Sequence, residues 1–482
     1  MTSPLPLVLT AEPGSYWRSF SSALDRVIFS GVFGLLLFGP LVFGAVEVWS
    51  ISILEVGAGL LFLLWATRQV AAGELEILGN PLFPPMLLLA GLVLVQLATG
   101  RTAYRAQTSS AALMYCTYGL LSFLVVQCLR RTSQVKVLAW MFSGYGFAVA
   151  MFALIQDIAP NGKLYWLRTL ESGGWIYGPF VNHNHYAGLM EMLTPIPLVI
   201  SFADGVRASR RALAALAAAL MASTIFLSGS RGGMAAFTVQ MVLLAGFLIT
   251  RRKNWKAALA FGAFVVIVLG LLVWLGGGEL VERITSIHSG TRTELTGGTR
   301  VTIDQDSLRI FVQKPVLGWG LGVFPDIYPQ FSSLATNLQV GMAHNDYLQL
   351  LVEMGVLGLV TALWFLLTLF RSALRKLKSW PSDTNSAVTL AAMLGVMGIL
   401  VHSFMDFNLQ IPGNAALFYV LCMLCAMEPR FGRHLRRERA NASREGTILP
   451  PPHAFRLEFA TRNSKSTGAI KSGRFSTTAS TR

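Results

Sequence analysis

Charged residues are scarce in this chain. They make up 13% of its 482 residues, whereas hydrophobic residues make up 53%, and the mean hydropathy is +0.55. So little charge excludes an ordinary soluble domain, which needs more polar surface. Apolar runs near the ~20 residues needed to cross a hydrocarbon core recur along the chain. Because a bilayer leaves no backbone polar group to water, the sequence predicts an all-α, polytopic membrane bundle.

Cysteine is also rare, with four residues in the chain. Cys116, Cys128, Cys422 and Cys425 fall in or beside apolar segments, where thiols usually act as small buried apolar groups. Cys422 and Cys425 have CxxC spacing, but a redox or metal role needs an accessible, activated thiolate. We therefore interpret all four as structural.

About twelve segments satisfy the length criterion for a membrane span. They are residues 27–44, 49–67, 82–99, 111–129, 135–156, 185–203, 212–227, 232–250, 257–275, 348–370, 387–404 and 414–427. This divides the chain into an N-terminal segment (1–26), a helical bundle (27–428) and a basic tail (429–482). A long loop, 276–347, precedes the tenth span. The tail has few large apolar residues, which predicts disorder.

Loop charge predicts the orientation, because short loops rich in Lys and Arg stay in the cytoplasm. Such clusters occur in alternate connections, at 130–136, 207–211, 251–256 and 371–378. An even number of spans then places both termini in the cytoplasm. The loops left outside are 182–185, 228–233, 276–343 and 406–412. The polar residues discussed next lie in or near these loops, so we expect an extracytoplasmic active site.

The formal net charge of +15 comes largely from the basic tail. Lysine and arginine near a membrane surface attract anionic lipid headgroups, and they also anchor the topology. We favour the topology anchor, with membrane lipids as the neighbours of the tail. Nucleic-acid binding is not expected, because no recognisable fold or aromatic platform accompanies the charge.

His344 lies where the long polar loop meets an apolar helix, within the run His344-Asn345-Asp346-Tyr347-Leu348. A histidine titrates near neutral pH and can take a proton from a hydroxyl group without a metal, as general-base catalysis requires. The structural alternative is that Asn345 or Asp346 caps the helix and His344 merely occupies the interface. We favour catalysis by His344, with Asn345 beside the substrate.

Arg231 begins an apolar segment and is flanked by Gly229, Gly232 and Gly233. Glycines let a bulky group approach closely, and a guanidinium group can bind phosphate in bidentate fashion. The alternative is an arginine that snorkels to the interface. We favour phosphate binding for Arg231 and assign Arg309 a similar substrate-binding role.

Two further polar groups remain open to more than one interpretation. His183 and Asn184 begin a span beside His185 and suit a polar vestibule, since too few ligands for a metal site accompany them. His402 and Asp406 would share a helical face if their helix continues that far, as a structural or a substrate-orienting pair.

The acidic pair Asp304 and Asp306 has a spacing that can hold a divalent cation. Two acids separated by one residue are also common in polar loops. We therefore favour solvated loop charges over a metal site.

The order of several motifs resembles the O-antigen ligase family. They are Ser230-Arg231-Gly232, the Arg309 segment leading into Pro315-Val316-Leu317-Gly318-Trp319-Gly320, His344-Asn345-Asp346-Tyr347-Leu348, and His402-Ser403-Phe404-Met405-Asp406-Phe407. The resemblance is clearest over residues 212–427. The segment 178–185 is similar to exopolysaccharide polymerase-like members.

This resemblance implies a multispan bacterial enzyme of the cytoplasmic (inner) membrane. Such enzymes transfer glycan from an undecaprenyl-diphosphate-linked donor, at the outer face of that membrane, to a glycan, lipid A core or protein acceptor. It implies no metal and no cofactor. With His344 as base and Arg231 and Arg309 near the diphosphate, we expect an inverting displacement.

A lipid-linked glycan transporter is the alternative function. A cavity with Arg and His side chains would also accommodate a diphosphate headgroup. A transporter would be expected to show repeated halves and a site near the midplane of the membrane, and the sequence shows neither pattern.

Overall fold

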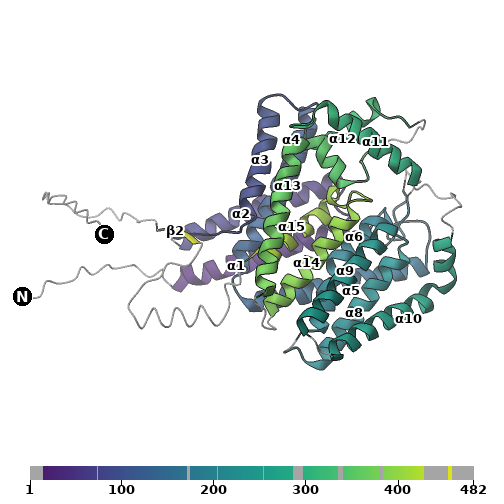
Figure 1. Ribbon diagram of the computed structural model, residues 1–482. Coiled ribbons are helices and arrows are strands. Elements are labelled where there is room, and N and C mark those ends of the chain that lie inside the picture. The colour runs from purple at the N-terminus through teal and green to yellow at the C-terminus, as the bar shows by residue number, and fades with distance from the viewer. Residues whose placement is uncertain are drawn as a thin grey trace, which may run out of the picture.

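The computed structural model describes residues 15–72, 74–170, 174–203, 205–252, 255–285, 297–334, 340–378, 384–427 and 454–458, and these form a mostly helical bundle (Figure 1). Its elements are α1 (Ser15–Leu41), α2 (Val48–Ala72), β1 (Glu74–Leu78), α3 (Phe83–Ala98), α4 (Arg105–Cys128), α5 (Thr132–Ile158), α6 (His183–Leu193), α7 (Pro195–Ser201), α8 (Ala208–Leu227), α9 (Arg231–Arg252), α10 (Trp255–Thr285), α11 (Gly297–Gln313), α12 (Phe324–Ile327), η2 (Tyr328–Gln330), α13 (Asp346–Lys378), α14 (Thr384–His402), η3 (Asn408–Gln410), α15 (Pro412–Ala426) and β2 (Ala454–Glu458). The predicted all-α class is confirmed.

All of the predicted membrane segments fall on helices. Within the described ranges, seven helices are long and apolar enough to cross a membrane, namely α1, α2, α4, α5, α8, α9 and α13. Shorter apolar helices occur in α3, α10, α14 and α15. The count of about twelve spans stays a prediction.

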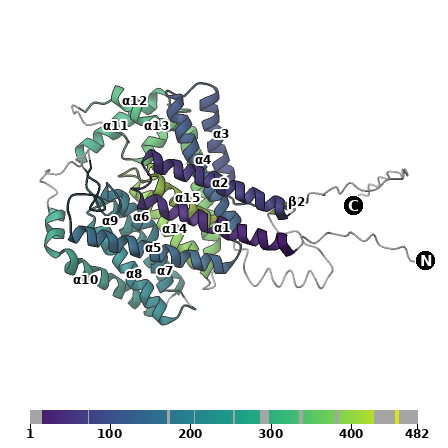
Figure 2. The same ribbon diagram turned by 180° about the vertical axis from the view of Figure 1, so that it is seen from behind.

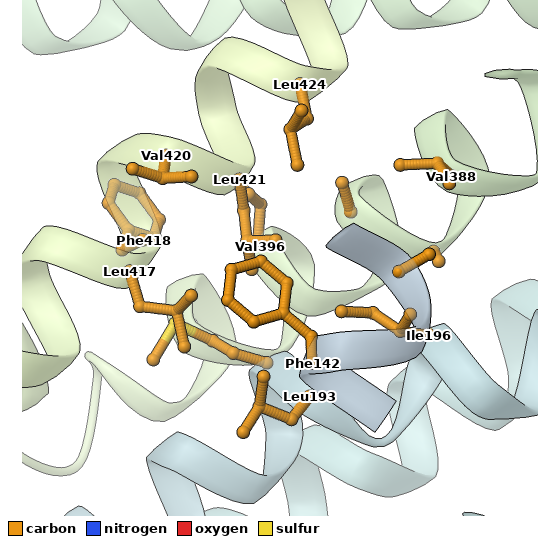
Figure 3. Packing of buried hydrophobic residues seen from close by; sticks show 14 of the residues in the cluster. Phe142, Leu193, Ile196, Val388, Val396, Leu417, Phe418, Val420, Leu421 and Leu424 are labelled. Atoms are coloured by element: carbon orange, nitrogen blue, oxygen red, sulfur yellow. The ribbon is translucent and has the colours of Figure 1, made fainter. Parts of the chain in front are cut away.

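The predicted sixth span is divided into α6 and α7, because Pro195 and Pro197 lack the backbone N–H that a continuous helix needs. Both helices are buried along almost their whole length, as is α15. Helices that are buried on all sides lie in the middle of the bundle. Figure 3 shows the packing there, with Phe142 of α5, Leu193 of α6 and Leu421 of α15 in one cluster. Seen from behind, α1 packs along α2 (Figure 2).

The predicted loop 276–347 contains regular structure. The helix α10 continues to Thr285, and α11 and α12 follow. The interpretation of Asp306 as a solvated loop charge is wrong, because Asp306 lies on α11 and is fully buried. Its carboxylate accepts hydrogen bonds from the Tyr328 hydroxyl (3.1 Å) and from the Ser333 Oγ (2.7 Å). Residues 286–296 and 335–339 of this loop lie outside the described residues.

A small sheet joins the bundle to a segment of the predicted tail. Strand β1 pairs antiparallel with β2, with Glu74 opposite Glu458. The rest of the tail from residue 428 onward and the first 14 residues lie outside the described parts of the chain. The division into terminal segments and bundle stays a prediction.

The helix α13 is broken at Gly355, whose φ is +63°. The break frees two carbonyl groups, and Trp319 N–H donates to Val352 O (2.9 Å) and Gly320 N–H to Glu353 O (3.0 Å). The Glu353 carboxylate accepts a further bond from Gly322 N–H (2.9 Å). The motif 315–320 therefore docks the segment that follows α11 onto α13.

We predict that Gly355→Ala destabilises the protein. Alanine is strained at this positive φ by about 1–2 kcal/mol, and its Cβ would overlap the carbonyl oxygen of Val316. The expected loss in unfolding free energy is about 2 kcal/mol or more. The measurement is the thermal midpoint of purified protein in detergent. Gly59→Ala in α2, where a Cβ meets nothing within 4 Å, is the control, and equal midpoints for the two variants would contradict the role of Gly355.

Candidate active site

The turn between α14 and α15 carries the central carboxylate of the site. The helix α14 ends at His402, whose carbonyl oxygen accepts the N–H groups of both Met405 (2.8 Å) and Asp406 (3.1 Å). This tight turn buries Asp406, with its side chain 1% exposed. Asp406 Oδ1 lies 3.6 Å from His344 Nδ1 and 3.8 Å from His185 Nε2. These are ion-pair separations, longer than hydrogen bonds.

The ring of Phe407 fixes the two imidazoles. It packs edge to face against His344 (centroids 4.7 Å apart) and against His185 (4.8 Å). His344 itself has a φ of +53°. That backbone conformation costs a non-glycine residue about 1–2 kcal/mol, and such strain persists where the surrounding structure enforces it, often at functional sites. Here it turns the His344 ring toward Asp406.

The charge of Asp406 follows from its neighbours. Burial alone raises the pKa of this carboxyl group, but the contacts with His185 and His344 outweigh burial and hold the pKa well below its usual range. Asp406 is therefore ionised at neutral pH. A carboxylate beside an imidazole can stabilise the positive charge that the ring gains when it takes up a proton.

The start of α13 is tied to the same turn. Asp346 is buried and accepts hydrogen bonds from Ser403 Oγ (2.8 Å), Leu409 N–H (3.2 Å) and Gln410 Nε2 (3.3 Å). Asn345 caps the helix, because its Oδ1 accepts the N–H groups of Tyr347 (3.1 Å) and Leu348 (3.2 Å). The capping alternative thus describes Asn345, while His344 is directed elsewhere.

His402 does not pair with Asp406. The helix ends at His402, and its ring is buried with Nδ1 2.8 Å from Glu191 Oε1 on α6. The other edge of the ring faces α9, where a Cβ on Gly232 would lie 2.6 Å from His402 Nε2. His402 therefore holds α14 against α6, and Gly232 allows α9 to approach the His402 ring closely.

Arg231 is exposed at the first position of α9, next to Gly232 and so beside the 402–406 turn. Within the preceding turn, Ser230 Oγ accepts the Gly233 N–H (3.1 Å).

The vestibule residues His183 and Asn184 are buried at the start of α6. The rings of His183 and Trp175 pack at a tilt with centroids 4.3 Å apart, and Trp175 packs on Gly229. Asn182 caps α6 by accepting the Asn184 N–H (2.9 Å).

Arg309 is not brought to this cluster. Its side chain is 67% exposed and pairs with Asp306 at 3.3 Å. Arg300, nine residues earlier on α11, projects from the opposite side of the helix at 100° per residue. Its Nη1 donates to the carbonyl oxygen of Met405 at 2.8 Å, and Asp304 on the same face interacts electrostatically with both Arg300 and His344.

Sequence reasoning missed Glu191 and Arg300. A signal for Glu191 existed, because it is an isolated acid in an apolar segment, and such residues have partners or functions. The sequence held no such signal for Arg300, since the choice between Arg300 and Arg309 depends on the orientation of α11. Among the described residues, no three or more His, Cys, Asp or Glu side chains are arranged to hold a metal ion.

Residues 216–363 match the family model described as O-antigen ligase. This region of the chain is similar to the O-antigen ligase family. The resemblance seen in the motifs is confirmed, and an enzyme that transfers glycan is supported in general terms. An uncharacterized protein of Haemophilus influenzae is 25% identical over 226 residues, which cover 44% of this chain and 54% of that relative. The match thus spans about half the length of the relative.

The matched region contains Arg231, Arg300 and His344. Asp406 and the Glu191–His402 pair lie outside the matched region, on α6 and on the segment from α14 to α15. The candidate site therefore also includes parts of the chain on either side of the matched region.

We predict that Glu191→Leu lowers the unfolding free energy strongly, by about 3 kcal/mol or more, because it leaves His402 buried without its charge partner. The double variant Glu191→Leu with His402→Leu is expected to lose much less than the two single losses added together. Thermal or denaturant unfolding in detergent measures this. Strictly additive losses would show that the two side chains do not form a coupled pair.

Proposed function

We propose that this protein is a membrane glycosyltransferase that uses an undecaprenyl-diphosphate-linked glycan as donor and a hydroxyl group as acceptor. The observation that carries the proposal is the placement of His344 against the ionised, buried Asp406, in a turn flanked by two arginines. A base and two cations around one turn suit a reaction in which a hydroxyl loses its proton and a diphosphate leaves.

His344 acts as the general base in this proposal. Its Nδ1 faces Asp406, so Nε2, on the other edge of the ring, accepts the proton of the acceptor hydroxyl. The acceptor oxygen forms a bond to the anomeric carbon as the bond from that carbon to the diphosphate oxygen breaks, and the diphosphate leaves with the electron pair. This single displacement inverts the anomeric configuration. Asp406 stabilises the imidazolium that forms.

Two guanidinium groups are suited to the diphosphate. Arg231 is exposed beside the 402–406 turn. Arg300 donates to Met405 O through Nη1, which holds its guanidinium group beside the turn. A fixed guanidinium with donors to spare can bind phosphate oxygens. Arg300 thus takes the role that the sequence suggested for Arg309.

The location and the acceptor belong to the same proposal. We infer a bacterial cytoplasmic membrane with both termini in the cytoplasm and the site at the outer face. The acceptor is a glycan, lipid A core or a protein. To identify the acceptor, purified enzyme is incubated with a polyprenyl-diphosphate glycan and each candidate acceptor in turn. Mass spectrometry of the new linkage then shows which acceptor was used. Lipid flipping in proteoliposomes with no new glycosidic bond would support a transporter instead.

We predict that His344→Ala lowers the turnover number about 10²- to 10⁴-fold, the usual contribution of a general base. The variant is expected to fold and keep its elution volume, because His185 remains beside the Asp406 carboxylate when the contacts of His344 with Asp406 and Phe407 are lost. Turnover is measured with purified protein. Wild-type turnover in a correctly folded variant would refute the assigned base.

Arg300→Gln is expected to lower kcat/KM for the donor about 10- to 100-fold, the equivalent of one lost charge-assisted hydrogen bond. Arg309→Gln on the opposite side of α11 is the matched comparison, and we expect a smaller loss there because that side chain is exposed. Donor titrations of both variants test this. A larger loss for Arg309→Gln would return the diphosphate role to Arg309.

A further inference from the structure

The helix α11 has an exposed apolar stripe although it is not one of the candidate membrane spans. Val301 is 55%, Leu308 47% and Val312 69% exposed. Spacings of seven and four residues place these side chains within about 40° of one another around the helix. The opposite side, with Ile303 and Ile310, is buried against the protein. A helix outside the membrane would ordinarily present polar residues on its exposed side.

The stripe continues onto a membrane-spanning surface. Past the end of α11, Val316 is also exposed, and its carbonyl oxygen accepts the N–H of Leu357 on α13 (3.3 Å). Leu357 and Val360 are exposed apolar residues of α13, which is a candidate span. One apolar surface therefore runs from α13 onto α11, whose ribbon lies beside the α13 end of the bundle (Figure 1).

The length of α13 places this junction at a membrane boundary. The candidate span 346–377 has 32 residues, about 48 Å at 1.5 Å per residue, which exceeds the ~30 Å hydrocarbon core. The stretch from Val356, just after the break at Gly355, to Arg375 covers about 30 Å. Beside this boundary Lys314 Nζ lies 3.9 Å from the centroid of the Trp319 ring, and Trp and Lys are typical of membrane interfaces.

We propose that α11 is an interfacial helix, with Val301, Leu308, Val312 and Val316 inserted into the lipid leaflet next to the site. Interfacial helices bury an apolar face at the boundary between headgroups and acyl chains, with basic residues beside the phosphates. Arg309 and Lys314 supply those basic groups. In this arrangement the Arg300 side of α11 faces the protein turn at headgroup level. The inference depends on the surface alone and holds whether or not the protein transfers glycan.

The test compares two adjacent exposed residues of α11 that project about 100° apart. A photo-crosslinking amino acid replaces Val312 in one variant of the full chain and Gln313 in the other, and each is reconstituted in nanodiscs of phosphatidylethanolamine and phosphatidylglycerol without donor. After illumination, mass spectrometry of the α11 peptide measures lipid adducts. Leu308 serves as a second position on the stripe.

We expect lipid adducts at positions 312 and 308 to exceed those at 313 by fivefold or more. Equal adducts at 312 and 313 would overturn the proposal. Crosslinks between two copies of the chain at position 312 would also overturn it and assign the stripe to a dimer. Adducts at 312 that form only after a polyprenyl diphosphate is added would assign the stripe to the donor chain instead of the bulk leaflet.

Discussion

The site depends on the contact between the buried carboxylate of Asp406 and two imidazole rings. An ionised group without water is stable only beside opposite charge or hydrogen-bond donors, and Asp406 has the two imidazoles of His185 and His344 close to Oδ1. This requirement brings together α6, the start of α13 and the turn after α14. Phe407 on the same turn packs edge to face against both imidazole rings.

Several helices around the site end or break close to it. The helix α14 ends at His402, α13 is broken at Gly355, and α6 stops before Pro195. Each interruption leaves backbone groups that other segments satisfy, as a low-dielectric surrounding requires. The 315–320 motif donates hydrogen bonds to the carbonyl groups that the break in α13 leaves free, and this contact holds the end of α11 against α13. The motif therefore has a docking role that its sequence alone does not reveal.

Hydrophobic run length was enough to locate the helices, because the membrane imposes one length scale on every span. It could not show that α11 is helical, since its residues are mixed in character, nor that Asp306 is buried. For the site, His344 and Asp406 were recognisable as ionisable groups at span ends. Their shared contact with His185, the partnership of His402 with Glu191 and the choice of Arg300 over Arg309 depend on helix rotation and long-range packing.

The central claim is that one diphosphate headgroup sits between Arg231 and Arg300, within reach of the centre served by His344. The most direct measurement is a cryo-electron microscopy structure of the full chain with bound polyprenyl diphosphate. The account predicts phosphate oxygens in hydrogen-bond contact with both guanidinium groups and an open path to His344 Nε2. A diphosphate bound away from the 402–406 turn would contradict it.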